Sequence, residues 1–364
     1  MKIGLAVGYF DPQVGGSEEV VKQLAAELAR RGHQVRVATS THPEREPGRM
    51  VVPVDEFDVR GNVAQGLKGD VLGYQRHLLE SDVDAWLFYA AQVWSTDAAL
   101  PLFGRIPPAV VVPCGYSGLH LPQFREYYDR LPSFLQRAAA LVYMSDGYQD
   151  YTHDRSVGLA DRMHVIPNGA AESEFAGGTT PPPPDGGRLV LTVANHYPDK
   201  GHDAAIRAFR VAAGPRDRLL IVGDVHDRDP RRTCWWSCRA SALRDRRITL
   251  ATGMPREKVV ASFRQASVFL FGSRVECAPL VIIEAMAAGI PFVTTPAGNV
   301  RDYPDAGLVT DEARLGEALR SILDDPVTAA ALGARGRSRW ERDHQWSVVA
   351  RQYEELFRQI CSES

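Results

Sequence analysis

Lysine is scarce in this chain of 364 residues, which takes nearly all of its 42 basic residues from arginine. Its lysines are Lys2, Lys22, Lys68, Lys200 and Lys258. The bias is typical of GC-rich bacterial genes and says nothing about mechanism. Because the formal net charge is −3, the chain has no excess positive charge for nucleic acid or an anionic membrane surface. No nucleic-acid partner is therefore expected.

Long apolar runs are also missing. No window reaches the roughly 18 uncharged apolar residues that a membrane-spanning helix requires. The N-terminus, M-K-I-G-L-A-V-G-Y-F, is too short for such a helix and lacks the small-residue cleavage site of a signal peptide. These absences favour a soluble cytoplasmic protein with no integral membrane segment, whose first residues form a buried strand.

Cysteine is too irregular to form a disulfide framework. The chain contains Cys114, Cys234, Cys238, Cys277 and Cys361. This odd number at uneven spacing argues against paired disulfides. Cys234 and Cys238 would share one face of a helix, and with His226 nearby a zinc site is conceivable. Structural zinc takes four ligands, however, and no second pair lies close in sequence. We therefore expect a surface helix with tryptophans packed on its domain, and no metal site.

Short apolar runs that suit strands alternate with segments of helical periodicity. Strands at 3–9 and 34–39 flank a helix at 17–31, with Ser17 as its cap and Gly32 as its stop. This β-α-β order implies a parallel sheet. Further strands are expected at 84–89, 109–113 and 140–144.

A stretch rich in proline and glycine, 176–187, is the best candidate for a linker, with a long surface loop as the alternative. Beyond it the alternation restarts, with strands at 188–193, 218–222, 247–250 and 267–271 and helices at 202–213 and 256–265. The chain is therefore expected to hold two doubly wound α/β domains. Ligands of such sheets bind at the carboxyl ends of the strands, so a cleft between the domains is the natural site.

Two glutamates, Glu276 and Glu284, bracket a short apolar run in the segment 273–293. A carboxylate with so little polar helix surface around it as Glu284 needs a partner. Glu284 could accept hydrogen bonds from a ribose diol, whereas Glu276 suits a neutral group that carries hydroxyls. The alternative is that Glu276 is a loop charge and Glu284 a solvated helix residue.

The segment between the glutamates has the features of an anion site. A helix that begins near 279–281 leaves its first amides without internal partners, and the helix dipole favours an anion such as a diphosphate there. Pro279 fits the first turn but offers no N–H. The donors would therefore be the amides of Leu280 and Val281.

The segment E-C-A-P-L-V-I-I-E-A-M-A-A-G-I-P-F-V resembles the E-x7-E region of retaining glycosyltransferases of family 4, which have the GT-B fold. G-Y-F-D-P-Q-V-G-G-S-E-E is similar to that family's glycine-rich N-terminal loop, and V-I-P-N-G to its entry into the C-terminal domain. P-D-K-G-H-D-A-A-I-R-A-F resembles its phosphate-binding K-G segment, and I-V-G-D and R-D-H-Q-W also fit. These segments span nearly the whole chain in the expected order.

The resemblance implies two facing Rossmann-like domains with an interdomain cleft. Residues 1–172 would form the acceptor-binding domain and 173–346 the domain that binds the nucleotide-sugar. A C-terminal helix at about 347–364 would pack back on the first domain.

The resemblance also implies site residues. The first glutamate of the family contacts the transferred sugar, the second contacts the ribose, and the K-G lysine binds donor phosphate; here these are Glu276, Glu284 and Lys200. Glu276 and Lys200 are thus the catalytic candidates, and Gly15 and Gly16 are expected against the diphosphate. The remaining donor-binding candidates are Asn195, Gly223, Gly253, Met254, Pro279, Leu280 and Val281.

The resemblance further implies transfer with retention and without a metal or other cofactor. Lys200, the helix amides and the glycine loop would neutralise the departing nucleoside diphosphate. The family is generally thought to use front-face displacement, so Glu276 is assigned a positioning and electrostatic role and no nucleophile is named.

The chain departs from the family's pattern at several positions. Asn195 stands where the family usually has arginine, which leaves Arg274 or His196 to supply the missing cation. Pro279 occupies the glycine-rich slot. Many members carry a histidine near the sugar and the acceptor where this chain has Cys114. His120 could replace it, and with Gly115 these residues are the candidates for the acceptor or sugar side.

Other protein classes fit less well. An NAD-dependent oxidoreductase would carry G-x-G-x-x-G after the first strand and an acid after the second, and neither is present. A sugar-nucleotide epimerase of GT-B-like fold and a non-catalytic nucleotide-sugar-binding protein stay open. The helix candidate 123–140 mixes charge signs and contains Pro132, so a soluble small-molecule acceptor, such as a sugar, an aminocyclitol or a natural product, is expected. UDP is the commonest donor nucleotide by family analogy, and the chain is expected to be a monomer or homodimer.

Overall fold

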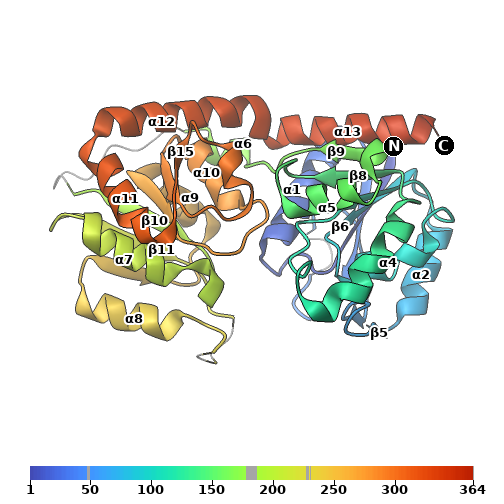
Figure 1. Cartoon of the computed structure of the whole chain (residues 1–364). Helices are drawn as coiled ribbons and strands as arrows, with labels where there is room; N and C mark the ends of the chain where they lie inside the picture. Colours follow the sequence, from blue (N-terminus) through green and yellow to red (C-terminus); the bar gives the residue numbers. More distant parts are fainter. Residues whose placement is uncertain (47–49, 178–186, 227–228, 230, 364) are drawn as a thin grey trace. The chain divides into compact units, whose positions relative to one another are not determined.

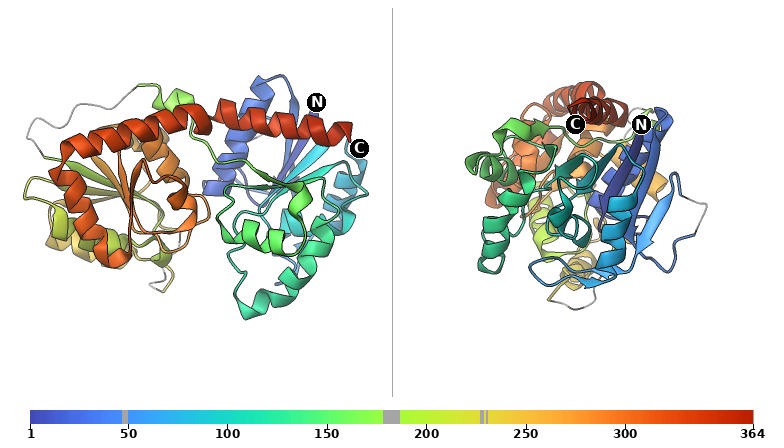
Figure 2. Two further views of the ribbon diagram at one scale, coloured as in Figure 1. Left: turned by 45° about the horizontal axis from the view of Figure 1, so that its top comes forward. Right: turned by 90° about the vertical axis from the view of Figure 1, so that its right-hand side faces the viewer.

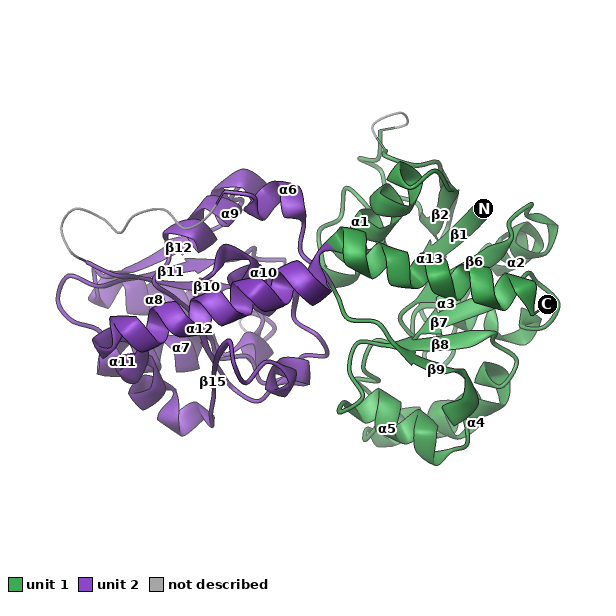
Figure 3. Ribbon diagram, turned by 90° about the horizontal axis from the view of Figure 1, so that it is seen from above, with its two compact units in different colours: residues 1–168, 346–364 green, residues 169–345 purple. Residues whose placement is uncertain are grey.

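The computed structural model describes residues 1–46, 50–177, 187–226, 229 and 231–363. It divides into two compact units, which Figure 3 distinguishes by colour. Unit 1 comprises Met1–Asn168 with Trp346–Ser364, and unit 2 comprises Gly169–Gln345. The division falls four residues before the boundary expected at 172, and most of the expected linker, residues 178–186, lies outside the described residues. None of the described helices has the length and hydropathy needed to cross a membrane.

Unit 1 contains a seven-stranded parallel sheet in the order β3-β2-β1-β6-β7-β8-β9 (Figure 1). Its strands are β1 (Lys2–Val7), β2 (Gln34–Ser40), β3 (Val54–Phe57), β6 (Ala85–Tyr89), β7 (Ala109–Val112), β8 (Ala140–Tyr143) and β9 (Met163–Val165). A separate antiparallel pair consists of β4 (Val59–Arg60) and β5 (Lys68–Gly69). The central strands β6, β7 and β8 are buried at every residue, because helices cover both faces of a parallel sheet.

The helices of unit 1 complete the doubly wound arrangement. They are α1 (Gly16–Arg30), α2 (Val71–Glu80), α3 (Trp94–Asp97), η1 (Leu100–Leu102), η2 (Pro122–Phe124), α4 (Arg125–Leu135), α5 (Gln149–Ser156), η3 (Ala160–Arg162) and α13 (Trp346–Ser362). The C-terminal helix α13 packs on α1, where Arg31 Nη2 lies 2.5 Å from Glu354 Oε2. Gly15 is the N-cap of α1, so the prediction that Ser17 caps this helix is wrong: the extended loop reaches Gly15 and helical geometry begins one residue before Ser17.

Unit 2 repeats the plan of a parallel sheet with helices around it (Figures 1 and 2). Its six strands are in the order β12-β11-β10-β13-β14-β15. Its strands are β10 (Leu189–Val193), β11 (Arg218–Val222), β12 (Ile248–Ala251), β13 (Val268–Phe271), β14 (Phe292–Thr294) and β15 (Gly307–Val309). Its helices are α6 (Glu172–Phe175), η4 (Pro198–Lys200), α7 (His202–Ala212), α8 (Trp235–Arg244), α9 (Arg256–Gln265), α10 (Leu280–Ala288), η5 (Gly298–Asp302), η6 (Glu312–Arg314), α11 (Leu315–Asp324), α12 (Pro326–Arg339) and the π-helical turn η7 (Trp340–His344).

Helix α10 lies in the core of unit 2. It is apolar around most of its circumference, and Ile282, Ile283, Ala285, Met286 and Ala287 are at most 1% exposed. Such a helix is stable only when other elements surround it. Its N-terminus is consequently held in one position by the packing of the whole domain.

Candidate functional site

The loops that follow β10 and β13 carry the sequence-predicted lysine and first glutamate. In the sheet of unit 2, β11 and β12 lie on one side of β10, whereas β14 and β15 lie beyond β13. The strand order therefore reverses between β10 and β13, and loops at such a switch point diverge to opposite faces and leave room for a ligand. Lys200 ends the first loop and Glu276 lies in the second, and Lys200 Nζ donates to Glu276 Oε1 at 2.7 Å. The structure thus brings together two residues 76 positions apart in sequence.

The carboxylate of Glu276 is held by a second donor. Ser273, which is fully buried, donates through Oγ to the same Oε1 atom at 2.7 Å. Ser273 Oγ also lies 3.2 Å from the carbonyl of Asp199, the residue before Lys200. Sequence reasoning missed Ser273 as a positioning residue. The available signal was a hydroxyl directly after the strand end Phe271-Gly272.

The loop that carries Lys200, residues 194–201, is called the lysine loop. Two glycines allow it to touch the end of β13. Gly201 has φ +61°, and a Cβ at this position would lie 1.7 Å from the carbonyl oxygen of Gly272. A Cβ has no room where two backbone segments approach this closely, and the left-handed backbone conformation also favours glycine. The glycine of the K-G segment therefore positions Lys200 beside the loop that carries Glu276.

The N-terminus of α10 follows four residues after Glu276. The helix begins at Leu280, within the predicted range 279–281, and Pro279 is its N-cap rather than a residue of its first turn. The N–H of Ile282 donates to the carbonyl of Pro279 at 3.2 Å, whereas the amides of Leu280 and Val281 come too early in the helix for a partner in the preceding turn. A second loop braces this entry: the N–H of Asn299 donates to the carbonyl of Cys277 at 2.8 Å. A Cβ on Gly298 would lie 2.4 Å from that same carbonyl. Neither Gly298 nor Asn299 was identified from the sequence.

Glu284 is buried at 6% exposure and has a cationic partner. Arg256 Nη2 donates to Glu284 Oε1 at 2.5 Å, and the same guanidinium binds Glu174 with contacts of 2.6 and 2.9 Å. The partner that sequence reasoning required for Glu284 is therefore Arg256, which it did not name. The available signal was a basic residue at the start of α9, two positions after the predicted site residue Met254.

The remaining donor-side candidates lie at the ends of β10, β11 and β12. The N–H of Asp224 donates to Asn195 Oδ1 at 3.0 Å, and the N–H of Gly253 donates to Asp224 Oδ1 at 2.6 Å. A Cβ on Gly223 would lie 1.8 Å from the carbonyl oxygen of Ala194. Asn195, Gly223 and Gly253 thus tie three strand ends together, and Asp224 is the residue that sequence reasoning overlooked.

The two residues suggested as replacements for the missing arginine are engaged elsewhere. The guanidinium of Arg274 binds Asp203 at 2.9 Å and Glu312 at 3.0 Å, and its charge is balanced by these two carboxylates. His196 is buried, and its Nδ1 atom lies 3.6 Å from Cys234 Sγ. His226 stacks on Tyr197 at 6.1 Å between ring centroids and does not join the cysteine pair.

In unit 1, the predicted glycine pair lies where α1 begins after β1. Gly15 is the extended N-cap, and Gly16 is the first helical residue. A Cβ on Gly16 would point into open space. The side chain of Glu18 folds back so that a Cβ on Gly15 would lie 2.3 Å from its Oε2. Burial raises the pKa of Glu18, which favours its neutral form near the helix N-terminus.

The predicted acceptor-side segment has an unusual backbone. Cys114, Gly115 and Tyr116 all have positive φ, at 61°, 95° and 49°. The other non-glycine residues with positive φ among those described, Ala90 and Gln92, follow the neighbouring strand β6. Left-handed geometry is costly for residues with a Cβ and persists at functional sites where the surroundings hold it.

Buried hydrogen bonds hold this turn. The N–H of Gly115 donates to Asp150 Oδ2 at 2.7 Å, and Tyr116 donates to Asp154 Oδ2 at 2.6 Å. Burial raises the pKa of Asp150 to about 6. His120, by contrast, is exposed on the loop that follows the turn.

A cavity of about 300 Å³ lies elsewhere in unit 1, between α4 and residues 63–64. Its polar wall includes Asp97, which accepts from the N–H of Val63 at 2.9 Å and from Tyr127 at 2.7 Å. Burial raises the pKa of Asp97 to about 6, although these hydrogen bonds oppose the shift. Cys114, Gly115 and His120 do not line this cavity.

Family models match both units. The model described as glycosyl transferases group 1 matches residues 180–339, and the model described as a glycosyl transferase 4-like domain matches residues 15–169. The chain belongs to the glycosyl transferases group 1 family. The resemblance stated from the sequence is confirmed, and so is the fold class, two Rossmann-like domains of the GT-B type.

Individual relatives of this chain are distant. An exopolysaccharide phosphotransferase of Streptomyces coelicolor is 26% identical over all of this chain, which spans only 41% of that relative's length. A GDP-mannose:cellobiosyl-diphosphopolyprenol alpha-mannosyltransferase of Xanthomonas campestris is 25% identical over 96% of this chain and 93% of its own. The crystal structure of Anabaena HepE in complex with UDP superposes with a TM-score of 0.79 at 17% identity, covering 99% of this chain and 100% of that one.

Proposed function

We propose that this glycosyltransferase moves a sugar, with retention of its anomeric configuration, from a UDP-sugar to a hydroxyl group of a soluble small molecule. The acceptor would be a sugar, an aminocyclitol or a natural product. The observation that carries the proposal is the contact between Lys200 and Glu276 at the switch point of the unit 2 sheet, immediately before the N-terminus of α10. A cation, a carboxylate and unpaired helix amides are what binding a sugar diphosphate requires.

Lys200 would neutralise the departing diphosphate. Its side chain is 29% exposed, so its ammonium group can turn from Glu276 toward a phosphate oxygen without crossing the core. The amides of Leu280 and Val281 would add fixed dipoles aimed at the same charge. With these groups in place, the transfer step would need no divalent metal. The role of Gly15 and Gly16 against the diphosphate stays a prediction.

Glu276 would orient the sugar rather than attack it. Its Oε1 atom accepts from both Lys200 and Ser273, and a carboxylate oxygen that accepts two hydrogen bonds is a weakened nucleophile. This favours departure of the diphosphate and attack of the acceptor on the same face of the sugar. NMR of the product tests the assignment: the new bond should keep the donor's anomeric configuration, and an inverted product would contradict it.

Glu284 would bind the ribose hydroxyls of the donor. Arg256 holds this buried carboxylate in place, and carboxylate oxygens can accept hydrogen bonds from two neighbouring hydroxyl groups. UDP is supported by the complex of the similarly folded Anabaena protein, whereas the Xanthomonas relative is named for GDP-mannose. Neither protein is more than 25% identical to this chain, so the base has to be measured.

A thermal-shift panel of UDP-, GDP-, ADP- and dTDP-sugars tests donor binding. A ligand at a hundred times its Kd stabilises by about 2.7 kcal/mol, which corresponds to a rise in Tm of roughly 5 to 10 °C for a domain of this size. We expect the UDP-sugars to raise Tm and Glu284→Ala to abolish the rise. Glu317→Ala, which removes an exposed glutamate from α11 of the same unit, should leave it intact.

The panel and a turnover assay together separate the possible outcomes. A shift accompanied by transfer or slow hydrolysis of a labelled donor supports the proposal. A shift without any turnover would indicate a nucleotide-sugar-binding protein, and inversion of the free sugar nucleotide would indicate an epimerase. The absence of a shift with all four donors would reject the donor site itself.

A further inference from the structure

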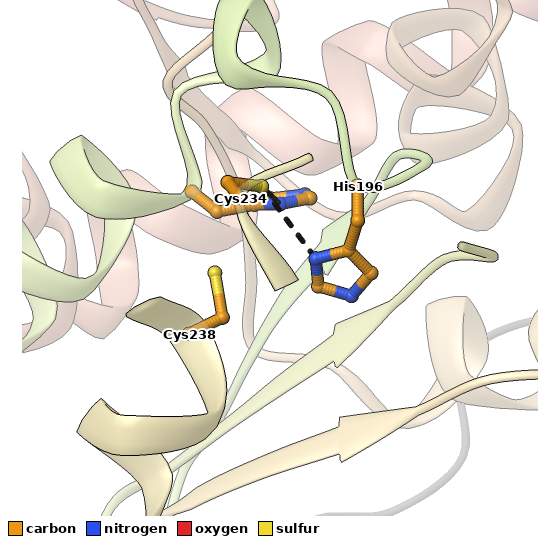
Figure 4. A group of neighbouring side chains, drawn as sticks. His196, Cys234 and Cys238 are labelled. Carbon is orange, nitrogen blue, oxygen red and sulfur yellow. Dashed lines mark hydrogen bonds between the residues drawn. The ribbon is translucent and has the colours of Figure 1, made fainter. Parts of the chain in front are cut away.

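Two histidines and two cysteines meet in unit 2 behind the lysine loop. His196 lies in the loop after β10, and His202 is the first residue of α7. Cys234 is the N-cap of α8, and Cys238 lies one turn further along that helix. Figure 4 shows Cys234 and His196 turned toward each other with Cys238 beside them. The nitrogen and sulfur atoms that the four residues offer all lie within 4.8 Å of one another.

The separations suit a tetrahedral metal ion. Zinc bound at about 2.3 Å by sulfur and 2.0–2.1 Å by nitrogen holds a nitrogen and a sulfur ligand about 3.6 Å apart. His202 Nδ1 lies 3.1 Å and His196 Nδ1 lies 3.6 Å from Cys234 Sγ. Shifts on the order of 1 Å in the remaining ligand atoms would complete the tetrahedron.

The surroundings of the cluster also point to a ligand. His196, His202 and Cys238 are 2%, 0% and 1% exposed. Both imidazoles turn their Nδ1 atoms toward the same sulfur, Cys234 Sγ. Two buried imidazole nitrogens that converge with two thiols in this way form a set of metal-ligand atoms, which indicates a site for an ion.

The spacing in sequence agrees with the geometry. The cluster combines a H-x5-H pair with a C-x3-C pair, and both spacings fall within the ranges of structural zinc sites. The expectation of no metal site failed to consider these histidines because they precede the cysteines by more than thirty positions. The parallel sheet closes that gap, since β10 and β11 are neighbours and the segments that follow them meet.

We propose that His196, His202, Cys234 and Cys238 bind one zinc ion in a structural site. Two thiolates and two imidazoles form a tetrahedral set that favours zinc over magnesium, calcium or manganese. Because four protein ligands fill the coordination sphere, no position stays open for water or substrate. The ion therefore does not contact the substrate, and the presence of the site can be tested whether or not the proposed function holds.

The ion would join α8 to the segment that carries the donor-side residues. His196 and His202 flank Lys200, and Asn195 directly precedes His196. Thr233 Oγ1 donates to the carbonyl of His196 at 2.7 Å, which is a weaker link between the same two segments. Zinc would join these two segments rigidly and thereby fix the backbone of the lysine loop.

Metal analysis of the full-length chain tests the site. The protein is expressed without an affinity tag that binds metals, in zinc-supplemented medium, and its zinc content is measured by mass spectrometry. We expect a stoichiometric amount of zinc in the unaltered chain and in Cys361→Ser, a matched change at a cysteine in unit 1. Cys238→Ser should lose most of the zinc and have a lower Tm.

Cobalt covers the case in which Cys238→Ser fails to fold. Co²⁺ added to the reduced, unaltered chain should give the intense visible bands of a tetrahedral site and a thiolate charge-transfer band, both displaced by zinc. The absence of stoichiometric zinc together with an octahedral cobalt spectrum would overturn the proposal. A Cys234–Cys238 disulfide, seen in freshly alkylated protein as two cysteines that carry no alkyl group and together lack two hydrogens, would overturn it equally and indicate a redox pair.

Discussion

Replacing Lys200 by methionine separates a role in catalysis from a role in folding. The change removes the ammonium group and keeps an unbranched side chain of similar length. In the free enzyme it breaks the contact with Glu276, whose carboxylate still accepts from Ser273. In the enzyme with bound donor it would remove the cation that we propose for the leaving diphosphate.

The expected size of the effect follows from the geometry. Two unit charges about 4 Å apart interact by about 4 kcal/mol at an effective dielectric constant near 20. Because the Lys200 side chain is 29% exposed, water screens part of this charge interaction. We therefore expect Lys200 to stabilise the leaving diphosphate by about 3 kcal/mol. That corresponds to a fall in kcat/KM of about 100-fold. The free energy of unfolding should change by less than about 1 kcal/mol, because a partly exposed ion pair contributes little to stability.

The assay is release of the nucleoside diphosphate from the donor identified by the thermal-shift panel. Lys258→Met is the matched control, since Lys258 is an exposed lysine of the same unit. Lys200→Met should lose about two orders of magnitude in kcat/KM relative to that control, with Tm within a few degrees. Equal activity of the two variants, or a collapse of Tm in Lys200→Met alone, would refute the reasoning.

Two further predictions concern the scaffold. Gly201→Ala should lower Tm far more than Gly253→Ala. Both residues have φ +61°, but of the two only Gly201 has backbone where its Cβ would lie, 1.7 Å from the carbonyl oxygen of Gly272. Similar Tm values for the two variants would contradict the close approach. Asp97, whose pKa rises to about 6 in the folded state, binds more protons when folded than when unfolded. Its contribution to the free energy of unfolding is present below about pH 4 and is lost as pH rises through 6, a change of about 3 kcal/mol. Urea unfolding at several pH values measures this change in the unaltered chain, and Asp97→Asn should lack it.

Much of the fold was predictable because local patterns dominate in parallel sheets. The strand at 218–222 and the helix at 256–265 were predicted with the bounds that the structure has, and β1, β2 and α1 agree within two residues. The strands that were missed, β3, β4, β5, β9, β14 and β15, are two to four residues long. So few residues carry too little apolar periodicity to distinguish a strand from a loop.

Only part of the candidate site stands out in the sequence itself. Glu276 and Glu284 stand out because they bracket an apolar run and a carboxylate in such surroundings needs a partner, whereas Lys200 was identified through the resemblance to the family's K-G segment. Ser273 and Arg256 do not stand out, since a serine in a loop and an arginine on an exposed helix start are ordinary. Their roles depend on which loops the strand order brings together, and this is a property of topology rather than of local sequence.

The same dependence on topology links the lysine loop to the zinc cluster. Gly201 presses the loop against the end of β13, Ser273 holds the carboxylate that Lys200 faces, and His196 and His202 anchor the loop on its other side. A flexible lysine gains catalytic effect only if its backbone does not move when the charge of the leaving group develops. If zinc supplies that rigidity, its loss should weaken donor binding and leave the contact of Glu284 with Arg256 unchanged. That contact joins α9 and α10, which pack in a different apolar cluster from α7 and α8. The cluster would then serve the transfer reaction without touching the substrate.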